Sequence, residues 1–146
     1  MTGKIVSINI SKKVGTKKTP VKTVILKKNA GILTDAHFSS KRPVSLLSWD
    51  DVKEWKNKSK QEVKLKYGIF AENISFEGFS LKKVKLNKII FINKKVKLKI
   101  IQVGKKCHSD CEIKKNTGSC IMPKYGVFAK VLSGGKISVG DIIEML

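Results

Sequence analysis

Short runs in which apolar and polar residues alternate recur along this chain, and this two-residue period constrains its fold more than any other feature. Within residues 95–102, for example, Val96, Leu98 and Ile100 are separated by lysines. Such alternation is typical of β-strands that bury one face. Runs of similar length and apolar character occupy residues 4–10, 21–28, 44–47, 85–92, 127–132 and 142–145. The chain is therefore predicted to be mainly β.

One segment has a helical period instead. Val52 and Trp55 would share one face of a helix over residues 49–59, Ser48 precedes it as a favourable N-cap residue, and two aspartates follow in the first turn. Many short strands with few helices predict a barrel or a sandwich-like sheet closed on itself. The expected fold is mainly β (α+β), a closed or partly closed β-barrel of short, mostly antiparallel strands with one or two short helices.

The other segments give weaker signals. Residues 31–43 and 67–74 have little periodicity and are expected to be loops. The side chains of Phe128, Leu132 and Ile142 lie in apolar runs near the end of the chain, and we expect all three to lie in the core.

Length and composition bound the class of protein. A chain of 146 residues has the size of one domain, so a single domain over residues 1–146 is expected. No apolar run approaches the roughly 18 residues that a membrane span needs, and the first residues do not resemble a signal peptide. A cytoplasmic protein without a membrane partner is expected, and its oligomeric state is left open.

The net charge of +20 has two interpretations. The chain has 30 lysines and a single arginine, spread over its whole length, which fits a compositional bias that also enriches asparagine and isoleucine. Alternatively, the charge attracts an anion such as a phosphorylated cofactor, an acidic partner protein or nucleic acid. Since no stacking residues or docking motif accompany the charge, nucleic-acid binding is expected to be nonspecific and sensitive to salt.

Three cysteines lie within fourteen residues, and the chain has no others. An odd number without a secretory signal argues against a structural disulfide framework. Together Cys107, His108, Cys111 and Cys120 supply enough thiolates and imidazole for zinc or an iron–sulfur cluster, although their spacing is not a standard one. In another interpretation, Cys111 or Cys120 resolves a persulfide or sulfenate on Cys107 by forming a disulfide.

Cys107 is the strongest candidate for a reactive residue. Lys105, Lys106 and His108 are its neighbours, and adjacent positive charge lowers the pKa of a thiol and favours the thiolate that attacks or ligates. The alternative is a small buried apolar residue.

Five further residues are candidates for a binding site. Arg42, the single arginine, has a planar fork that binds phosphate or carboxylate in two-pronged fashion, or it forms a structural ion pair with Asp35 or Glu72. His37 either binds a cofactor and transfers protons, or forms a local hydrogen bond beside Asp35. Glu72 and Asn73 either line the same pocket or anchor a loop.

Four patches of sequence, in order, resemble the MOSC family, the domain named after the C-terminal part of molybdenum-cofactor sulfurases. They are residues 34–37 (TDAH) with 42–47 (RPVSLL), 68–74 (GIFAENI), 102–107 (QVGKKC), and 122–132 (MPKYGVFAKVL) with the glycines that follow. The resemblance covers nearly the whole chain. Thr34 stands where the family has glycine, so the backbone there is expected to lose its freedom to adopt a positive φ. Lys41 and Pro43 replace commoner neighbours of Arg42, and the cysteine segment is longer than in simple members.

The resemblance implies a barrel of the MOSC type, related to the pyruvate-kinase β-barrel, and a role around the molybdenum cofactor (molybdopterin). It implies that Cys107 is the family cysteine. The residues expected to bind the cofactor are Arg42, His37, Asp35, Asn73, Glu72, Lys105 and Lys106.

Three functions remain open. In the first, the chain binds the molybdenum cofactor and carries sulfur, as a cysteine persulfide, from a separate pyridoxal-phosphate cysteine desulfurase to a molybdenum enzyme. The chain is too short to include a desulfurase domain, so sulfur transfer is the enzymatic activity it would support. In the second, it is a molybdenum-cofactor-dependent reductase of N-hydroxylated compounds. In the third, it is a Cys/His metal-binding domain whose basic surface attracts nucleic acid.

Overall fold

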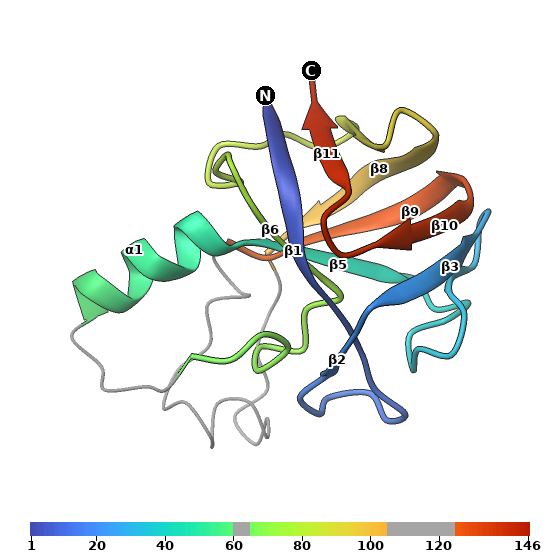
Figure 1. Ribbon diagram of the computed structural model, residues 1–146, viewed down its shortest axis with the longest axis horizontal. Coiled ribbons are helices and arrows are strands. Elements are labelled where there is room, and N and C mark those ends of the chain that lie inside the picture. The colour runs from blue at the N-terminus through green and yellow to red at the C-terminus, as the bar shows by residue number, and fades with distance from the viewer. Residues whose placement is uncertain (60–64, 105–124) are drawn as a thin grey trace.

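The computed structural model describes residues 1–59, 65–104 and 125–146 (Figure 1). Eleven strands and one helix are present in these ranges. Their bounds are β1 Thr2–Ile10, β2 Thr19–Val21, β3 Thr23–Lys27, β4 Gly31–Ile32, β5 Val44–Ser48, α1 Trp49–Ser59, β6 Ile74–Glu77, β7 Ile89–Ile92, β8 Val96–Val103, β9 Val127–Ser133, β10 Gly135–Ser138 and β11 Ile142–Met145.

Seven of the strands close into a barrel, in the order β1, β11, β7, β8, β9, β5, β6 and back to β1. The closing pair is β1 with β11, in which Thr2 lies opposite Glu144. All neighbours in the ring are antiparallel except β5 and β6, which are parallel, with Leu46 opposite Ile74. β2 extends the sheet beside β1, and β10, β3 and β4 form a separate small sheet. The predicted mainly β barrel of mostly antiparallel strands is confirmed.

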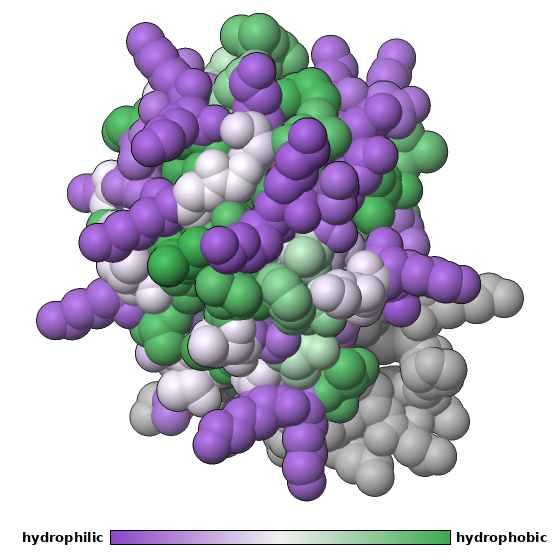
Figure 2. Space-filling model, turned by 90° about the vertical axis from the view of Figure 1, so that its right-hand side faces the viewer, coloured by the Kyte–Doolittle hydropathy of each residue, from purple (hydrophilic) through white to green (hydrophobic). Residues whose placement is uncertain are grey.

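The barrel interior follows the alternation in the sequence. In β8 the side chains of Val96, Leu98 and Ile100 are buried, while the lysines between them are partly or fully exposed. Each such aliphatic side chain contributes roughly 1.5–3 kcal/mol to folding when it leaves water. Figure 2 shows one side of the molecule, on which hydrophilic side chains project around areas of apolar surface.

Two of the three residues expected in the core near the end of the chain lie elsewhere. Phe128 is buried, but Leu132 is half-buried and Ile142 is 43% exposed. In β11 the inward-facing residues are Ile143 and Met145. The apolar run therefore begins at Ile142, one residue before the first inward-facing side chain. Because successive side chains of a strand point to opposite faces, one residue decides the outcome.

Helix α1 confirms the predicted range of 49–59 and packs across one side of the barrel. The ring of Trp55 meets that of Phe70 edge to face, with centroids 5.5 Å apart. The Asp51 carboxylate in its first turn accepts hydrogen bonds from Ser80 Oγ (2.6 Å) and the Leu81 N–H (2.8 Å). The acidic first turn therefore also fixes the loop that follows β6. No helix in the described ranges is long and apolar enough to cross a membrane.

Several short strands were not predicted, and β6 shows why. Its residues Ile74, Ser75 and Phe76 are all buried, because the strand lies between β5 and β1 within the barrel. A strand buried on both faces has no alternation to detect. The strand predicted over 85–92 begins only at Ile89, since Asn87 has a positive φ of 69°.

Candidate functional site

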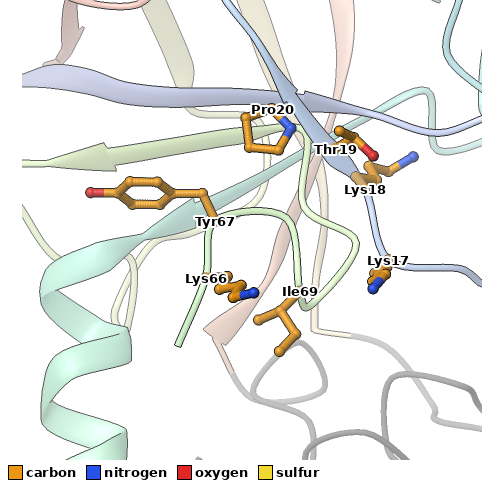
Figure 3. Close-up of a pocket in the computed structure, with 7 residues that line it drawn as sticks. All are labelled: Lys17, Lys18, Thr19, Pro20, Lys66, Tyr67 and Ile69. Atoms are coloured by element: carbon orange, nitrogen blue, oxygen red, sulfur yellow. The ribbon is translucent and has the colours of Figure 1, made fainter. Parts of the chain in front are cut away.

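An open pocket of about 680 Å³ lies between β2 and the loop that precedes β6 (Figure 3). Its lining residues are Lys17, Lys18, Thr19, Pro20, Lys66, Tyr67 and Ile69. Gly68 allows the two segments to meet: its φ is +87°, and a Cβ at this position would collide with the backbone oxygen of Lys18. The Lys18 N–H donates to the Gly68 carbonyl (2.8 Å). Glycine is therefore required here by both backbone conformation and space.

Lys18 is the residue at the centre of the site that sequence analysis missed. Its side chain is fully buried, and Nζ lies 2.8 Å from Asp35 Oδ1. Nζ is also 3.1 Å from Ser11 Oγ and 3.2 Å from His37 Nδ1. A lysine is almost never buried unless it is paired. Nothing in the spacing or composition distinguishes this lysine from the other 29.

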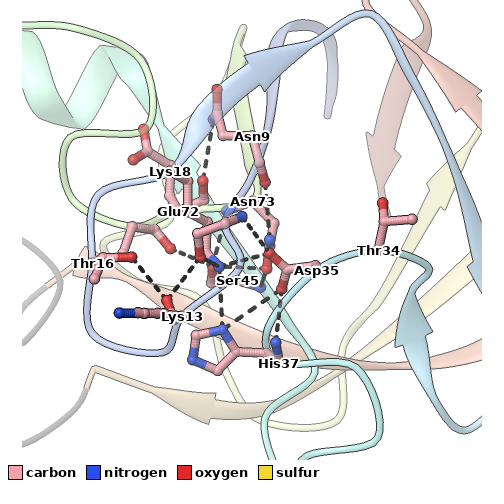
Figure 4. A network of polar contacts seen from close by, with 12 residues as sticks. Asn9, Lys13, Thr16, Lys18, Thr34, Asp35, His37, Ser45, Glu72 and Asn73 are labelled. Carbon is pink, nitrogen blue, oxygen red and sulfur yellow. Dashed lines mark hydrogen bonds and ion pairs between the residues drawn. The ribbon is translucent and has the colours of Figure 1, made fainter.

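Asp35 is held from both sides (Figure 4). Besides Lys18, Oδ1 accepts the Ser11 N–H (3.1 Å), and Oδ2 accepts the backbone N–H of His37 (3.1 Å). Burial by itself raises the pKa of this carboxyl group, but the contacts with His37 and Lys18 outweigh it and hold the pKa well below its usual range. Asp35 is therefore a fixed negative charge that orders the loop.

His37 is the member of this cluster that reaches solvent. Its side chain is 25% exposed, whereas those of Lys18 and Asp35 are 0% exposed. Asp35 and His37 were expected to lie together, either as site residues or as a local hydrogen-bonded pair, and the structure brings them together.

Arg42 lies further along the same loop and is exposed. Its guanidinium carbon lies 5.2 Å from the centroid of the Phe128 ring, a cation–π contact. The alternative of an ion pair with Asp35 or Glu72 is not what the described contacts show, since Asp35 pairs with Lys18 and the Glu72 oxygens accept hydrogen bonds from neighbouring groups.

Asn73 has the contacts of a structural anchor. Its Oδ1 accepts the Ser45 N–H (3.0 Å), and its Nδ2 donates to the Asn9 carbonyl (3.1 Å). Its own N–H donates to Ser45 Oγ (2.9 Å). These bonds join β5 to β1 just before β6 begins between them, so the loop-anchor interpretation fits. Cofactor binding by Asn73 stays a prediction.

Glu72 is also fully buried, beside Asn73 in the network of Figure 4. Its carboxylate accepts the Phe70 N–H (3.2 Å) and the hydroxyl of Ser75 (2.9 Å). Burial raises the pKa of Glu72 to about 7, against the opposing effect of these hydrogen bonds. Its expected role in holding a cofactor likewise stays a prediction.

The expectation for Thr34 was wrong. Its φ is 74°, so the backbone keeps the left-handed conformation even though the residue is not glycine. The hydroxyl of Thr34 donates to the Leu33 carbonyl, a local contact that accompanies this conformation. The turn that leads into Asp35 and His37 therefore forms although Thr34 has a side chain.

The cysteine segment lies outside the described residues. This applies to Cys107, Cys111 and Cys120, together with His108, Lys105 and Lys106. Both described flanks of the segment meet at the end of the β8–β9 pair, where the Gly104 N–H donates to the Gly126 carbonyl (2.7 Å). Phe128, the ring under Arg42, is two residues from Gly126. The segment thus leaves and rejoins the barrel close to Arg42.

No group of three His, Cys, Asp or Glu side chains able to hold a metal ion is present in the described part of the chain. The cysteine cluster that was predicted as an alternative metal site lies outside the described residues. Among the described residues, the exposed Arg42 and the partly exposed His37 are the candidate donors to an anion, whereas the Lys18 ammonium is buried against Asp35.

Comparisons with known proteins agree on the fold. The family profile of the MOSC domain matches residues 34–144. The solved structure of the YuaD protein from Bacillus subtilis is similar, with a TM-score of 0.83 and 16% identity over 99% of this chain and 96% of that one. YiiM from Geobacillus stearothermophilus has a TM-score of 0.73 and 20% identity, over 99% of this chain and 75% of that one. YiiM from Escherichia coli has a TM-score of 0.70 and 17% identity, over 100% and 70%. No curated protein sequence matches.

Proposed function

This chain belongs to the MOSC domain family, and from that premise we propose that it binds the molybdenum cofactor and carries sulfur as a persulfide on Cys107. The observation that carries the proposal is the exposed guanidinium of Arg42, which lies over the Phe128 ring. Buried Lys18 fixes the loop of His37, and exposed Arg42 stands beside the point where the cysteine segment leaves the barrel.

The donor set fits the cofactor, which is a phosphorylated and therefore anionic group. Arg42 is exposed and presents a planar fork of N–H donors, the group that suits a phosphate best. His37 is the second candidate contact, because it is partly exposed and supported from behind by Lys18. When bound, the cofactor would supply a molybdenum centre that exchanges sulfur ligands.

The role proposed for Cys107 is nucleophilic. Its thiolate attacks the terminal sulfur of a persulfide on the donor protein, the donor's S–S bond breaks, and the donor cysteine leaves as a thiolate. Lys105 and Lys106, which are adjacent in sequence, favour the thiolate form. The partners we propose are a separate cysteine desulfurase as donor and a molybdenum enzyme as acceptor, both in the cytoplasm.

Intact-mass spectrometry tests the carrier role. The unreduced protein is incubated with a cysteine desulfurase and cysteine, and its mass is compared with that of Cys107→Ser and of the matched control Cys120→Ser. We expect one added sulfur atom in the wild type and in Cys120→Ser but none in Cys107→Ser. Addition to all three proteins, or to none of them, contradicts the assignment of Cys107.

Elemental analysis tests the cofactor role separately. Protein purified from cells that make the cofactor is expected to contain molybdenum in near-stoichiometric amount, and Arg42→Lys should lose most of it because lysine lacks the two-pronged fork. Lys41→Arg, at the neighbouring exposed position, should keep it. Zinc or iron in place of molybdenum would favour a metal site in the cysteine segment.

A further inference from the structure

We propose that Lys18 is a positioning residue that fixes His37 in a single neutral tautomer, with its proton on Nε2, so that His37 offers a hydrogen-bond donor to an oxyanion. The idea rests on the proposed function only in taking the exposed edge of His37 to face the ligand.

The Lys18 ammonium has three protons to donate. The acceptors around Nζ include Asp35 Oδ1 at 2.8 Å, Ser11 Oγ at 3.1 Å and His37 Nδ1 at 3.2 Å. The Ser11 hydroxyl donates its own proton to the Lys13 carbonyl (3.0 Å), which leaves its lone pairs for Lys18. An ammonium has no lone pair, so Nδ1 has to accept in this contact.

Asp35 is the competing partner for Nδ1 of His37. The distance from Nδ1 to Asp35 Oδ2 is 3.6 Å, longer than a hydrogen bond, and Oδ2 already accepts the backbone N–H of His37 at 3.1 Å. Asp35 therefore orients the main chain of His37, while Lys18 sets the protonation of the ring.

The other ring nitrogen of His37 is Nε2. A neutral imidazole with an unprotonated Nδ1 carries its proton on Nε2. In Figure 4 this nitrogen points away from Asp35 and Lys18, on a side chain that is one quarter exposed. The site therefore presents an N–H group. It suits an oxygen of phosphate or of another oxyanion, and it does not suit a metal ion, which would need the Nε2 lone pair.

Nuclear magnetic resonance of the ring nitrogens tests this inference directly, without any cofactor. The chain has two histidines, so a long-range ¹H–¹⁵N spectrum of the ¹⁵N-labelled protein together with His108→Gln assigns His37. At mildly alkaline pH we expect Nδ1 to resonate as an unprotonated nitrogen and Nε2 as a protonated one. The reverse pattern, or an average of the two tautomers, would overturn the proposal even if the protein carries sulfur as proposed.

Variants connect the tautomer to Lys18. Lys18→Met leaves Asp35 as an unpaired buried charge and risks unfolding, so it is combined with Asp35→Asn in a second variant. In either variant that folds, the two tautomers should become mixed or exchange. Lys22→Met, which removes an exposed lysine outside the pocket, should leave the pattern unchanged. A wild-type pattern in the Lys18 variants would show that the fold, and not Lys18, sets the tautomer.

Titration with inorganic phosphate tests the ligand class. The Nε2 resonance of His37 should shift in the wild type, more than with chloride at matched ionic strength, and the shift should be lost with the tautomer in the Lys18 variants. Equal shifts with phosphate and chloride would overturn the oxyanion assignment. Failure of sulfur transfer to Cys107 would leave these spectra unchanged, so the two proposals are separable.

Discussion

At the scale of single residues, the site contains two departures from what side-chain chemistry prefers. Thr34 holds a φ of 74°, which costs a residue with a Cβ roughly 1–2 kcal/mol relative to the right-handed conformation. Glu72 is a carboxyl group without exposed surface. Both lie in segments that position other groups, Thr34 just before Asp35 and Glu72 just before Asn73.

Thr34→Gly should stabilise the protein by about 0.5–1 kcal/mol. The relief of the left-handed conformation exceeds the conformational entropy of about 0.4–1 kcal/mol that glycine adds to the unfolded chain. Thermal unfolding should show a melting temperature higher by about 2–4 °C. Thr23→Gly, in the regular strand β3, is the control and should lower it. A lower melting temperature for Thr34→Gly would mean that the hydroxyl contact with Leu33 outweighs the strain.

Glu72→Gln should change how stability depends on pH. Because the pKa of Glu72 is about 7 in the folded protein and near 4.5 when unfolded, the folded state retains a proton that the unfolded state releases between these values. Its contribution is fully present below about pH 4.5 and is lost as pH rises through 7, at about 1.4 kcal/mol per pH unit, or about 3 kcal/mol in total.

Urea unfolding at about pH 5 and about pH 8 measures this effect. The wild type should lose stability relative to Glu72→Gln over that interval. Glu77→Gln, which removes a carboxylate from an exposed ion pair with Lys53, should keep the wild-type slope. Parallel curves for Glu72→Gln and the wild type would mean that the carboxyl group is charged in the folded protein at both pH values.

At the scale of elements, the sequence predicted the strands and the helix that bury one face. It missed strands in which burial leaves no such pattern. The predicted ranges lie close to the observed ones for β1, β5, β8, β9, β11 and α1. For most of these elements, burial of one face leaves a periodic pattern in the sequence. β6 has no such period, and β10 begins at Gly135 in a segment for which no strand was predicted. Asp35, His37 and Arg42 were predicted as site residues through motif resemblance and residue type, whereas Lys18 depends on packing with Gly68 that no local pattern encodes.

Asn73 is the clearest case of one side chain that joins elements. Asn73→Ala would leave the Ser45 N–H and the Asn9 carbonyl without these partners between β5 and β1, so we expect a loss of about 2–4 kcal/mol in the free energy of unfolding. Chemical denaturation measures this loss. Asn57→Ala, on the exposed side of α1, should change stability by less than about 0.5 kcal/mol. A comparably small loss for Asn73→Ala would show that water replaces the bonds.

At the scale of the whole molecule, the net positive charge is the main influence on stability that the sequence shows. A net charge of +20 on 146 residues repels itself across the surface, and this repulsion destabilises the compact state. The barrel tolerates it because the outward faces of strands such as β8 place lysines in solvent. The one lysine described above as fully buried, Lys18, is neutralised by Asp35.

Added salt should therefore stabilise the protein. Between about 0.1 M and about 1 M sodium chloride the screening length falls from about 10 Å to about 3 Å, so the urea midpoint should rise while nonspecific DNA binding is lost. A variant with Lys22, Lys27 and Lys136 changed to glutamine should gain less, since these exposed lysines lie on or beside the small β3–β10 sheet. An equal gain would assign the effect to salting-out of apolar surface.

The seam between β1 and β11 has a consequence for the order in which the protein can be made. The Met1 amino group donates to the Met145 carbonyl, a contact between positions 144 apart in the chain. During synthesis β1 emerges first and can pair with β2 and then β6, but its first residues have no partner until β11 has left the ribosome. Closing so distant a contact is slow, and an unpaired strand edge invites pairing with other chains in the meantime. We therefore expect closure of the β1–β11 seam to come late in folding, and the unpaired edge of β1 is the place where a chaperone would act.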